Sequence, residues 1–183
     1  PVTTPSINLT SGRDILLDRI NLSAVTSGGV KLQAARDVNV MLSDICCGPT
    51  ARDITAPGNI DITATTGAIK RTADDFVNLS GYDITLATAN GIDTGGTITA
   101  AHAYSEVRTS GDLTVGSVSG SILSFSAPAG AILDGNGAGV NNVTATTSLS
   151  LNAKNGIDLD TTTPSLTLAN STGGAISVRN TGT

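Results

Sequence analysis

The chain has 183 residues, the size of one domain, and its 39% hydrophobic content is enough for a continuous core. The net charge of −5 and a pI near 4.5 argue against a nucleic-acid partner, because phosphate binding needs a clustered basic surface. No apolar run approaches the roughly 18 to 20 residues that span a bilayer, so we expect no membrane span. The first residues lack a charged or apolar leader, and we expect a mature chain or a piece of a longer one.

The composition predicts an all-β fold. Thr occurs 27 times, Ser 18 times and Asn 13 times, whereas Glu occurs once and Trp is absent. β-branched residues and turn formers therefore dominate, and the long side chains that favour helices are almost missing. Fourteen of the fifteen acidic residues are Asp, which favours turns and strand ends.

Short strands recur along the chain, about one every eight residues. Each has an apolar residue, any residue and a second apolar residue, and a turn rich in Gly, Asn, Asp, Ser or Thr follows it. The clearest copies are 7–9, 20–22, 30–32, 38–40, 60–62, 84–86, 113–115, 149–151, 166–168 and 176–178.

Six strands of this pattern are followed by glycine, five residues after the second apolar position: 60–62, 84–86, 113–115, 123–125, 149–151 and 166–168. The glycines are Gly67, Gly91, Gly120, Gly130, Gly156 and Gly173. In most copies an Ile follows one or two residues later. We interpret the motif as strand, tight turn, strand, with glycine at positive φ in the corner and the Ile resuming the inward row.

A solenoid and an antiparallel meander both fit short strands with glycine turns. Asn90-Gly91 and Asn155-Gly156 are typical hairpin loops and favour the meander. The very short strands and the 24 residues between Gly67 and Gly91 favour three strands per coil instead. We therefore predict a parallel β-helix of roughly seven coils in one domain, residues 1–183, about 35 Å long. Right-handed crossovers are the general expectation.

Two segments break this rhythm and are predicted to be loops that leave the helix. Residues 134–139 are rich in glycine, and residues 100–106 hold the single His and the single Glu of the chain. Since such excursions often build the binding face of a solenoid, His102, Tyr104 and Glu106 form a candidate contact loop. A passive surface loop is the competing interpretation.

The two cysteines are neighbours, Cys46 and Cys47, and are followed by Gly48-Pro49. They are incidental thiols in a turn, a strained vicinal disulfide, an inter-chain bridge or a redox switch; the sequence leaves these alternatives open. No companion His or second Cys pair indicates a metal site.

Runs such as 81–87, 111–115 and 155–159 resemble the repeats of filamentous-haemagglutinin-type proteins, the large exoproteins of bacterial two-partner secretion, and of related autotransporter adhesins. The resemblance extends over nearly the whole chain but is one of repeat style. It implies a right-handed parallel β-helix shaft, export across the outer membrane, and roles in attachment, aggregation or biofilm. The amino-terminal secretion module of these proteins is not recognisable here.

No catalytic pattern stands out. A polysaccharide-active β-helix would need carboxylates stacked on one face, yet the repeat offset places Asp61 over Thr85 and Asp83 over Asn59. Aromatic platforms for sugars are almost absent, and the Gly-Gly-x-Gly-x-Asp repeats of calcium rolls do not occur. His102 has no motif that would place it in a nucleophilic triad.

We therefore expect a non-catalytic, extracellular segment of a bacterial surface protein that needs no cofactor. Its expected partners are flanking repeats or other copies of itself, end to end, and unidentified host or bacterial surface molecules. An uncapped solenoid exposes strand edges at both ends, so a filament subunit is the alternative. A polysaccharide-active enzyme is a more remote one.

Overall fold

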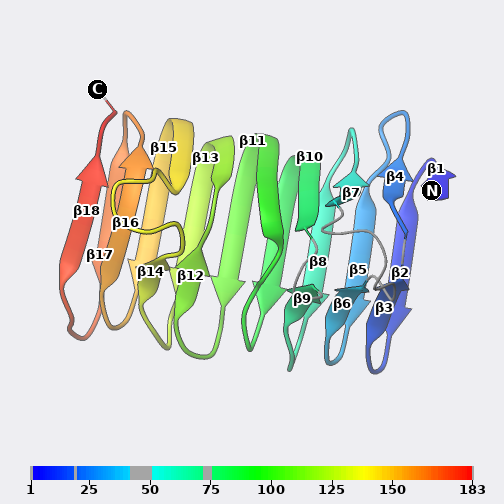
Figure 1. The fold of residues 1–183 in the computed structure, drawn as a ribbon, viewed down its shortest axis with the longest axis horizontal. Helices are drawn as coiled ribbons and strands as arrows, with labels where there is room; N and C mark the ends of the chain where they lie inside the picture. Colours follow the sequence, from blue (N-terminus) through cyan, green and yellow to red (C-terminus); the bar gives the residue numbers. More distant parts are fainter. Residues whose placement is uncertain (1, 19, 42–50, 72–75, 183) are drawn as a thin grey trace.

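The computed structural model describes residues 2–18, 20–41, 51–71 and 76–182, which form eighteen β-strands and no helix. Every strand pair among them is parallel. The strands lie side by side along one rod, with the two termini at opposite ends (Figure 1). The predicted parallel solenoid is confirmed, and the antiparallel meander is wrong for the described residues.

The first face of the rod is an unbroken ladder of eight strands. It comprises β2 (Ile7–Ser11), β5 (Val30–Ala34), β8 (Ile60–Ala64), the second halves of β10 (Phe76–Thr88), β11 (Gly95–Arg108), β13 (Val118–Ala127) and β15 (Val143–Ala153), and β17 (Leu166–Asn170). Eight strands are separated by seven turns, as predicted. The spacing varies from 17 residues between Leu149 and Leu166 to 30 between Val30 and Ile60.

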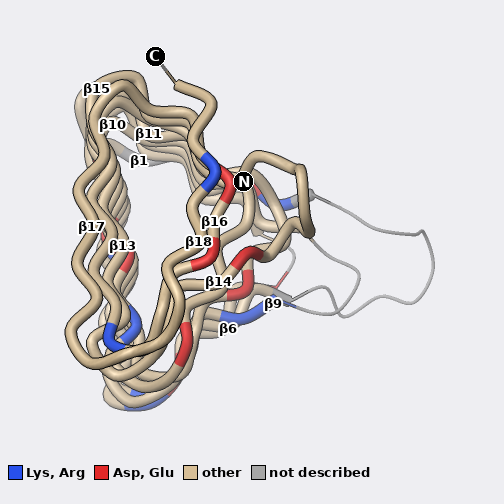
Figure 2. Tube along the Cα trace, turned by 90° about the vertical axis from the view of Figure 1, so that its left-hand side faces the viewer, with Lys and Arg blue, Asp and Glu red and all other residues tan. Residues whose placement is uncertain are grey.

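Two further faces complete each coil. The second face comprises β3 (Ile15–Asp18), β6 (Val38–Met41) and β9 (Ile69–Arg71), then β12 (Leu113–Val115), β14 (Ile132–Asp134), β16 (Ile157–Thr162) and β18 (Ile176–Asn180). The third face comprises β1 (Val2–Thr4), β4 (Leu22–Ala24), β7 (Ala51–Thr55), the first parts of β10, β11, β13 and β15, and the end of β16. Seen along the rod, the coils superimpose around one interior (Figure 2).

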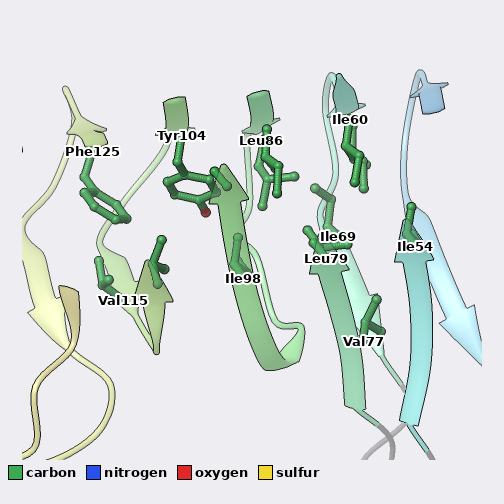
Figure 3. Packing of buried hydrophobic residues seen from close by; sticks show 14 of the residues in the cluster. Ile54, Ile60, Ile69, Val77, Leu79, Leu86, Ile98, Tyr104, Val115 and Phe125 are labelled. Atoms are coloured by element: carbon green, nitrogen blue, oxygen red, sulfur yellow. The ribbon is translucent and has the colours of Figure 1, made fainter. Parts of the chain in front are cut away.

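Alternate residues of each strand point inward, because successive side chains of a strand lie on opposite faces. In the first face, Leu32, Ile62 and Leu86 stack on one another and are at most 2% exposed. The third face contributes a row of smaller residues: Ala24, Ala56, Gly81, Ala100, Gly120 and Ala145. Aliphatic layers thus form one continuous core, part of which is seen in Figure 3.

Aspartates join successive coils at the corner that precedes the second face. Asp14 accepts a hydrogen bond from the Asp37 amide at 3.1 Å, and Asp37 accepts one from the Ala68 amide at 2.8 Å. The Arg36 guanidinium and the Asp37 amide lower the pKa of Asp14 to about 2, and the Ala68 amide and Lys70 lower that of Asp37. The short Asp side chain therefore acts at strand ends, as the composition indicates.

Close packing between coils, rather than a positive φ, explains some of the motif glycines. Only Gly91 and Gly156 have the predicted positive φ, at 118° and 129°. A Cβ at Gly67 or Gly130 would lie 2.2 Å from atoms of the adjacent coil. Gly120 lies inside β13, next to the register shift between Gly120 and Ile122 at which the strand passes from the third face to the first, but it has no positive φ. Ile69, Ile132 and Ile157 do resume the inward row, whereas Ile122 is 41% exposed.

The loop predicted at residues 100–106 is wrong, because this segment belongs to β11. Tyr104 and Glu106 stack on Ile84 and Leu86 and occupy the two inward positions of an ordinary coil. The apolar-x-apolar pattern is lost because Glu106 takes the place of an aliphatic residue. The glycine-rich loop is confirmed, since no strand crosses the interval between β14 and β15. Cys46 and Cys47 lie outside the described residues.

Substituting alanine at two glycines of the same motif separates close packing from turn chemistry. Gly130→Ala forces a Cβ to within 2.2 Å of the Gly111 backbone, so we expect a loss of about 1–3 kcal/mol in the free energy of unfolding. Gly173→Ala meets no atom within 4 Å and is the matched control, with an expected gain of up to about 1 kcal/mol. Urea denaturation measures both; equal losses would contradict the packing role.

Candidate functional site

Polar side chains interrupt the apolar core near the middle of the rod. In the first face, Glu106 lies between Leu86 and Phe125 in an inward row that is otherwise aliphatic or aromatic. In the second face, Arg71 follows Val40 in the corresponding inward row, and Thr94 follows Arg71. These positions lie in consecutive coils, so the polar residues form one local cluster rather than scattered exceptions.

Glu106 and Tyr104 form a buried hydrogen-bonded pair. The Tyr104 hydroxyl donates to Glu106 Oε2 at 2.5 Å, and the two residues are 1% and 3% exposed. Tyr104 packs against Phe125, with ring centroids 5.4 Å apart (Figure 3). Burial raises the pKa of Glu106 to about 7, although the Tyr104 hydroxyl partly opposes that rise. Burial beside Glu106 raises the pKa of Tyr104 well above its usual value.

The second face is discontinuous beside this pair. Ile92 bridges to Ile69 on its amino-terminal side, but no ladder joins Ile92 to β12, the next strand of the face. The Arg108 side chain occupies part of the interval and donates hydrogen bonds to the carbonyl oxygens of Ser110 and Asp112. The first and third faces continue through the same coils without a break.

A cavity of about 490 Å³ lies at this discontinuity. Glu106 contributes to its wall from the first face, and residues of both flanking coils complete it. The polar residues of the wall include Arg71, Asp93, Thr94, Ser117 and Asn136. Arg71 Nε donates to Asp93 Oδ1 at 2.8 Å, and the Arg71 guanidinium lies 5.8 Å from the centre of the Phe76 ring. The break in one face thus gives a buried carboxyl group access to a hollow.

The three residues of the predicted contact loop separate into two environments. Tyr104 and Glu106 face the interior, whereas His102 lies outside the rod. His102 Nδ1 is 2.8 Å from Asp83 Oδ1, and its ring stacks on that of Tyr82 with centroids 5.2 Å apart. Sequence reasoning missed Arg71, Asp93 and Thr94. For Arg71 and Thr94 the signal was a polar residue at a register position where other coils carry Leu or Val, whereas Asp93 occupies an outward position beside Lys70 and gave no such signal.

The outer carboxylates follow the predicted register in part. Asp61 lies beside Thr85, as the repeat offset predicts. The sequence did not reveal the stacked pair of Asp14 and Asp37, both of which are engaged by backbone amides and by Arg36 or Lys70. Within the described residues, no three His, Cys, Asp or Glu side chains converge in a way that could hold a metal ion.

The chemistry open to the cluster is that of one buried carboxyl group that can gain or lose a proton near neutral pH. The ionised Glu106 carboxylate accepts a hydrogen bond from the Tyr104 hydroxyl but forms no ion pair with a described Lys, Arg or His. Arg71 is close to the same cavity but pairs with Asp93. A buried unpaired carboxylate is costly, so the neutral form is favoured up to about pH 7.

Glu106→Gln should make the protein less sensitive to alkaline pH. The pKa of Glu106 is about 7 in the folded chain and has an ordinary value of 4.5, so wild-type stability falls as pH rises between these values. Above pH 7 the loss amounts to about 3 kcal/mol, which the neutral amide avoids. Urea denaturation at pH 5 and pH 8 should show a variant advantage confined to pH 8.

Asp61→Asn, on the outer side of the same face, makes the same chemical change as a control and should show a small effect. An advantage of Glu106→Gln that is equal at pH 5 and pH 8 would contradict the linkage.

Comparison with known proteins gives no match: no family model, no curated protein and no solved structure is similar to this chain. The described part of the chain contains no helix with the length and apolar character needed to cross a bilayer.

Proposed function

We propose that the chain is a non-catalytic shaft segment of a secreted bacterial surface protein, which separates or presents other parts of that protein in attachment, aggregation or biofilm. The observation that carries the proposal is the unbroken ladder of eight strands in the first face. Each coil is held by main-chain hydrogen bonds to its neighbours. Further coils of the same kind can therefore be added to the rod while the pattern of its core stays the same.

The outer surface suits such a spacer. From Ser23 onward, the outward row of the third face carries a hydroxyl in every described coil: Ser23, Thr55, Ser80, Thr99, Ser119, Thr144, Thr162 and Thr181. Uncharged hydroxyl rows are well hydrated. They offer few of the aromatic and arginine anchors that dominate tight protein interfaces. The resemblance to haemagglutinin-type repeats agrees with this role.

Removing one complete coil tests whether the segment acts through its length. Deleting residues 104–122 joins Ala103 to Leu123, the residue that follows Tyr104 in the same inward row. We expect a folded rod that is shorter by about 4.8 Å, the spacing of paired strands, as measured by small-angle scattering.

If the chain is a shaft, the bacterium that produces it should still display the protein on its surface, as detected by surface labelling, and should still attach after this deletion. A deletion that is one residue shorter, 106–123, joins Ser105 to Ser124 and places Ser124 instead of Phe125 at the inward position of Glu106. It shifts the strand out of register, is the matched control and should unfold the rod. The proposal would be overturned if the chain were absent from the cell surface, or if the purified chain cleaved a polysaccharide.

End-to-end assembly is a second candidate, which the two terminal coils favour. One interior row of the first face begins at Leu9 and ends at Leu168, and each of these leucines is 38% exposed. Ile176, which stacks on the buried Ile157, is 50% exposed. A second copy placed in register would cover these residues and satisfy the open strand edges.

Charge at the open coil should therefore block assembly. We expect the wild type to form larger species in sedimentation velocity as its concentration rises, and the Leu168→Lys/Ile176→Lys variant to remain monomeric. Lysine at the outward position Thr167 controls for charge alone. A wild type that stays monomeric at millimolar concentration would dismiss the filament.

A further inference from the structure

The cavity beside Glu106 has the features of a ligand site that a shaft does not need. Its volume of about 490 Å³ lies within the range of small-molecule sites. It opens where the second face is broken, and Glu106, a residue that is only 3% exposed, lines its wall. The repeat itself does not require Glu at this position, since Leu86 and Phe125 occupy it in the adjacent coils.

Charge selects the kind of ligand. Arg71 and Asp93 pair with each other at 2.8 Å, so their charges largely cancel. The ionised Glu106 then leaves a net negative charge in the wall, beside hydroxyl and amide oxygens from Thr94, Ser117 and Asn136. An anion would be repelled, whereas a cation that donates hydrogen bonds would satisfy both the charge and the oxygens.

Size and ligand number argue for an organic cation. A bound metal ion requires several carboxylate or other strong ligands, and the described residues bring no such group together. The cavity also has apolar walls from Ile92, Ile98 and Val118. An aliphatic body can cover these walls while its ammonium group reaches the carboxylate.

We propose that this cavity binds a small primary amine whose ammonium group pairs with Glu106, with its carbon body against the apolar wall. Binding favours the ionised carboxyl group, so below neutral pH the amine displaces the proton of Glu106 into solvent. Affinity for the amine should therefore rise up to tenfold per pH unit below pH 7, and it should level off above it.

A charged and an uncharged probe of the same shape test the proposal. We would titrate the whole chain with n-butylamine and with n-butanol and follow backbone amide shifts by NMR at pH 7.5. We expect shifts of the amides of Thr94, Glu106 and Ser117, and an affinity for the amine at least tenfold above that for the alcohol. Absence of shifts at these amides, or equal affinity for the two probes, overturns the proposal.

Three variants separate the effect of the charge from that of the cavity. Glu106→Gln should bind both probes equally, while Asp61→Asn should keep the preference for the amine. Gly116→Leu should weaken binding of both probes, because Gly116 lines the cavity and a Cβ there meets no atom within 4 Å. Tenfold selectivity that persists in Glu106→Gln would overturn the role of Glu106. These outcomes are independent of whether the chain acts as a shaft.

Discussion

The in-register stacking of parallel strands is the constraint on which the rest of this structure depends. Each coil donates and accepts main-chain hydrogen bonds along its neighbours, so a residue faces the interior only if its equivalents above and below do so too. Leu32, Ile62 and Leu86 meet this condition and are almost fully buried. The corners absorb length differences, and the number of residues per turn can vary from 17 to 30 without disturbing the rows.

The same constraint explains which parts of the fold the sequence could predict. Strands with aliphatic pairs, such as Ile60 and Ile62, identify themselves by their alternation, and they predicted the solenoid and its number of coils. Tyr104 and Glu106 could not be identified in this way, because a Glu in the interior erases the alternation and makes a strand resemble a loop. Their 20-residue offset from Ile84 and Leu86 was the remaining signal, and an irregular pitch conceals it.

The glycines show a second limit of sequence reasoning. Their recurrence is visible in the sequence, but the physical reason for it is visible only between coils. Glycine is required at position 91 by its own positive φ, whereas Gly130 is required because the backbone of Gly111 in the preceding coil leaves no room for a Cβ. Local turn rules describe the first case alone. The cavity was hidden for the same reason, since Arg71, Asp93 and Glu106 are far apart in sequence and come together only by stacking.

A rod of this kind can contain a polar site because each of its three faces joins adjacent coils. A gap in one face leaves the other two to hold the coils together. Between Ile92 and β12 the second face contributes no ladder, yet the first and third faces continue through the same coils. The gap therefore opens the interior without dividing the rod. Burying Glu106 there destabilises the folded chain above neutral pH, a penalty that Leu or Phe would avoid. A spacer alone gains nothing from it, so the position of Glu106 is better explained by what the cavity can bind.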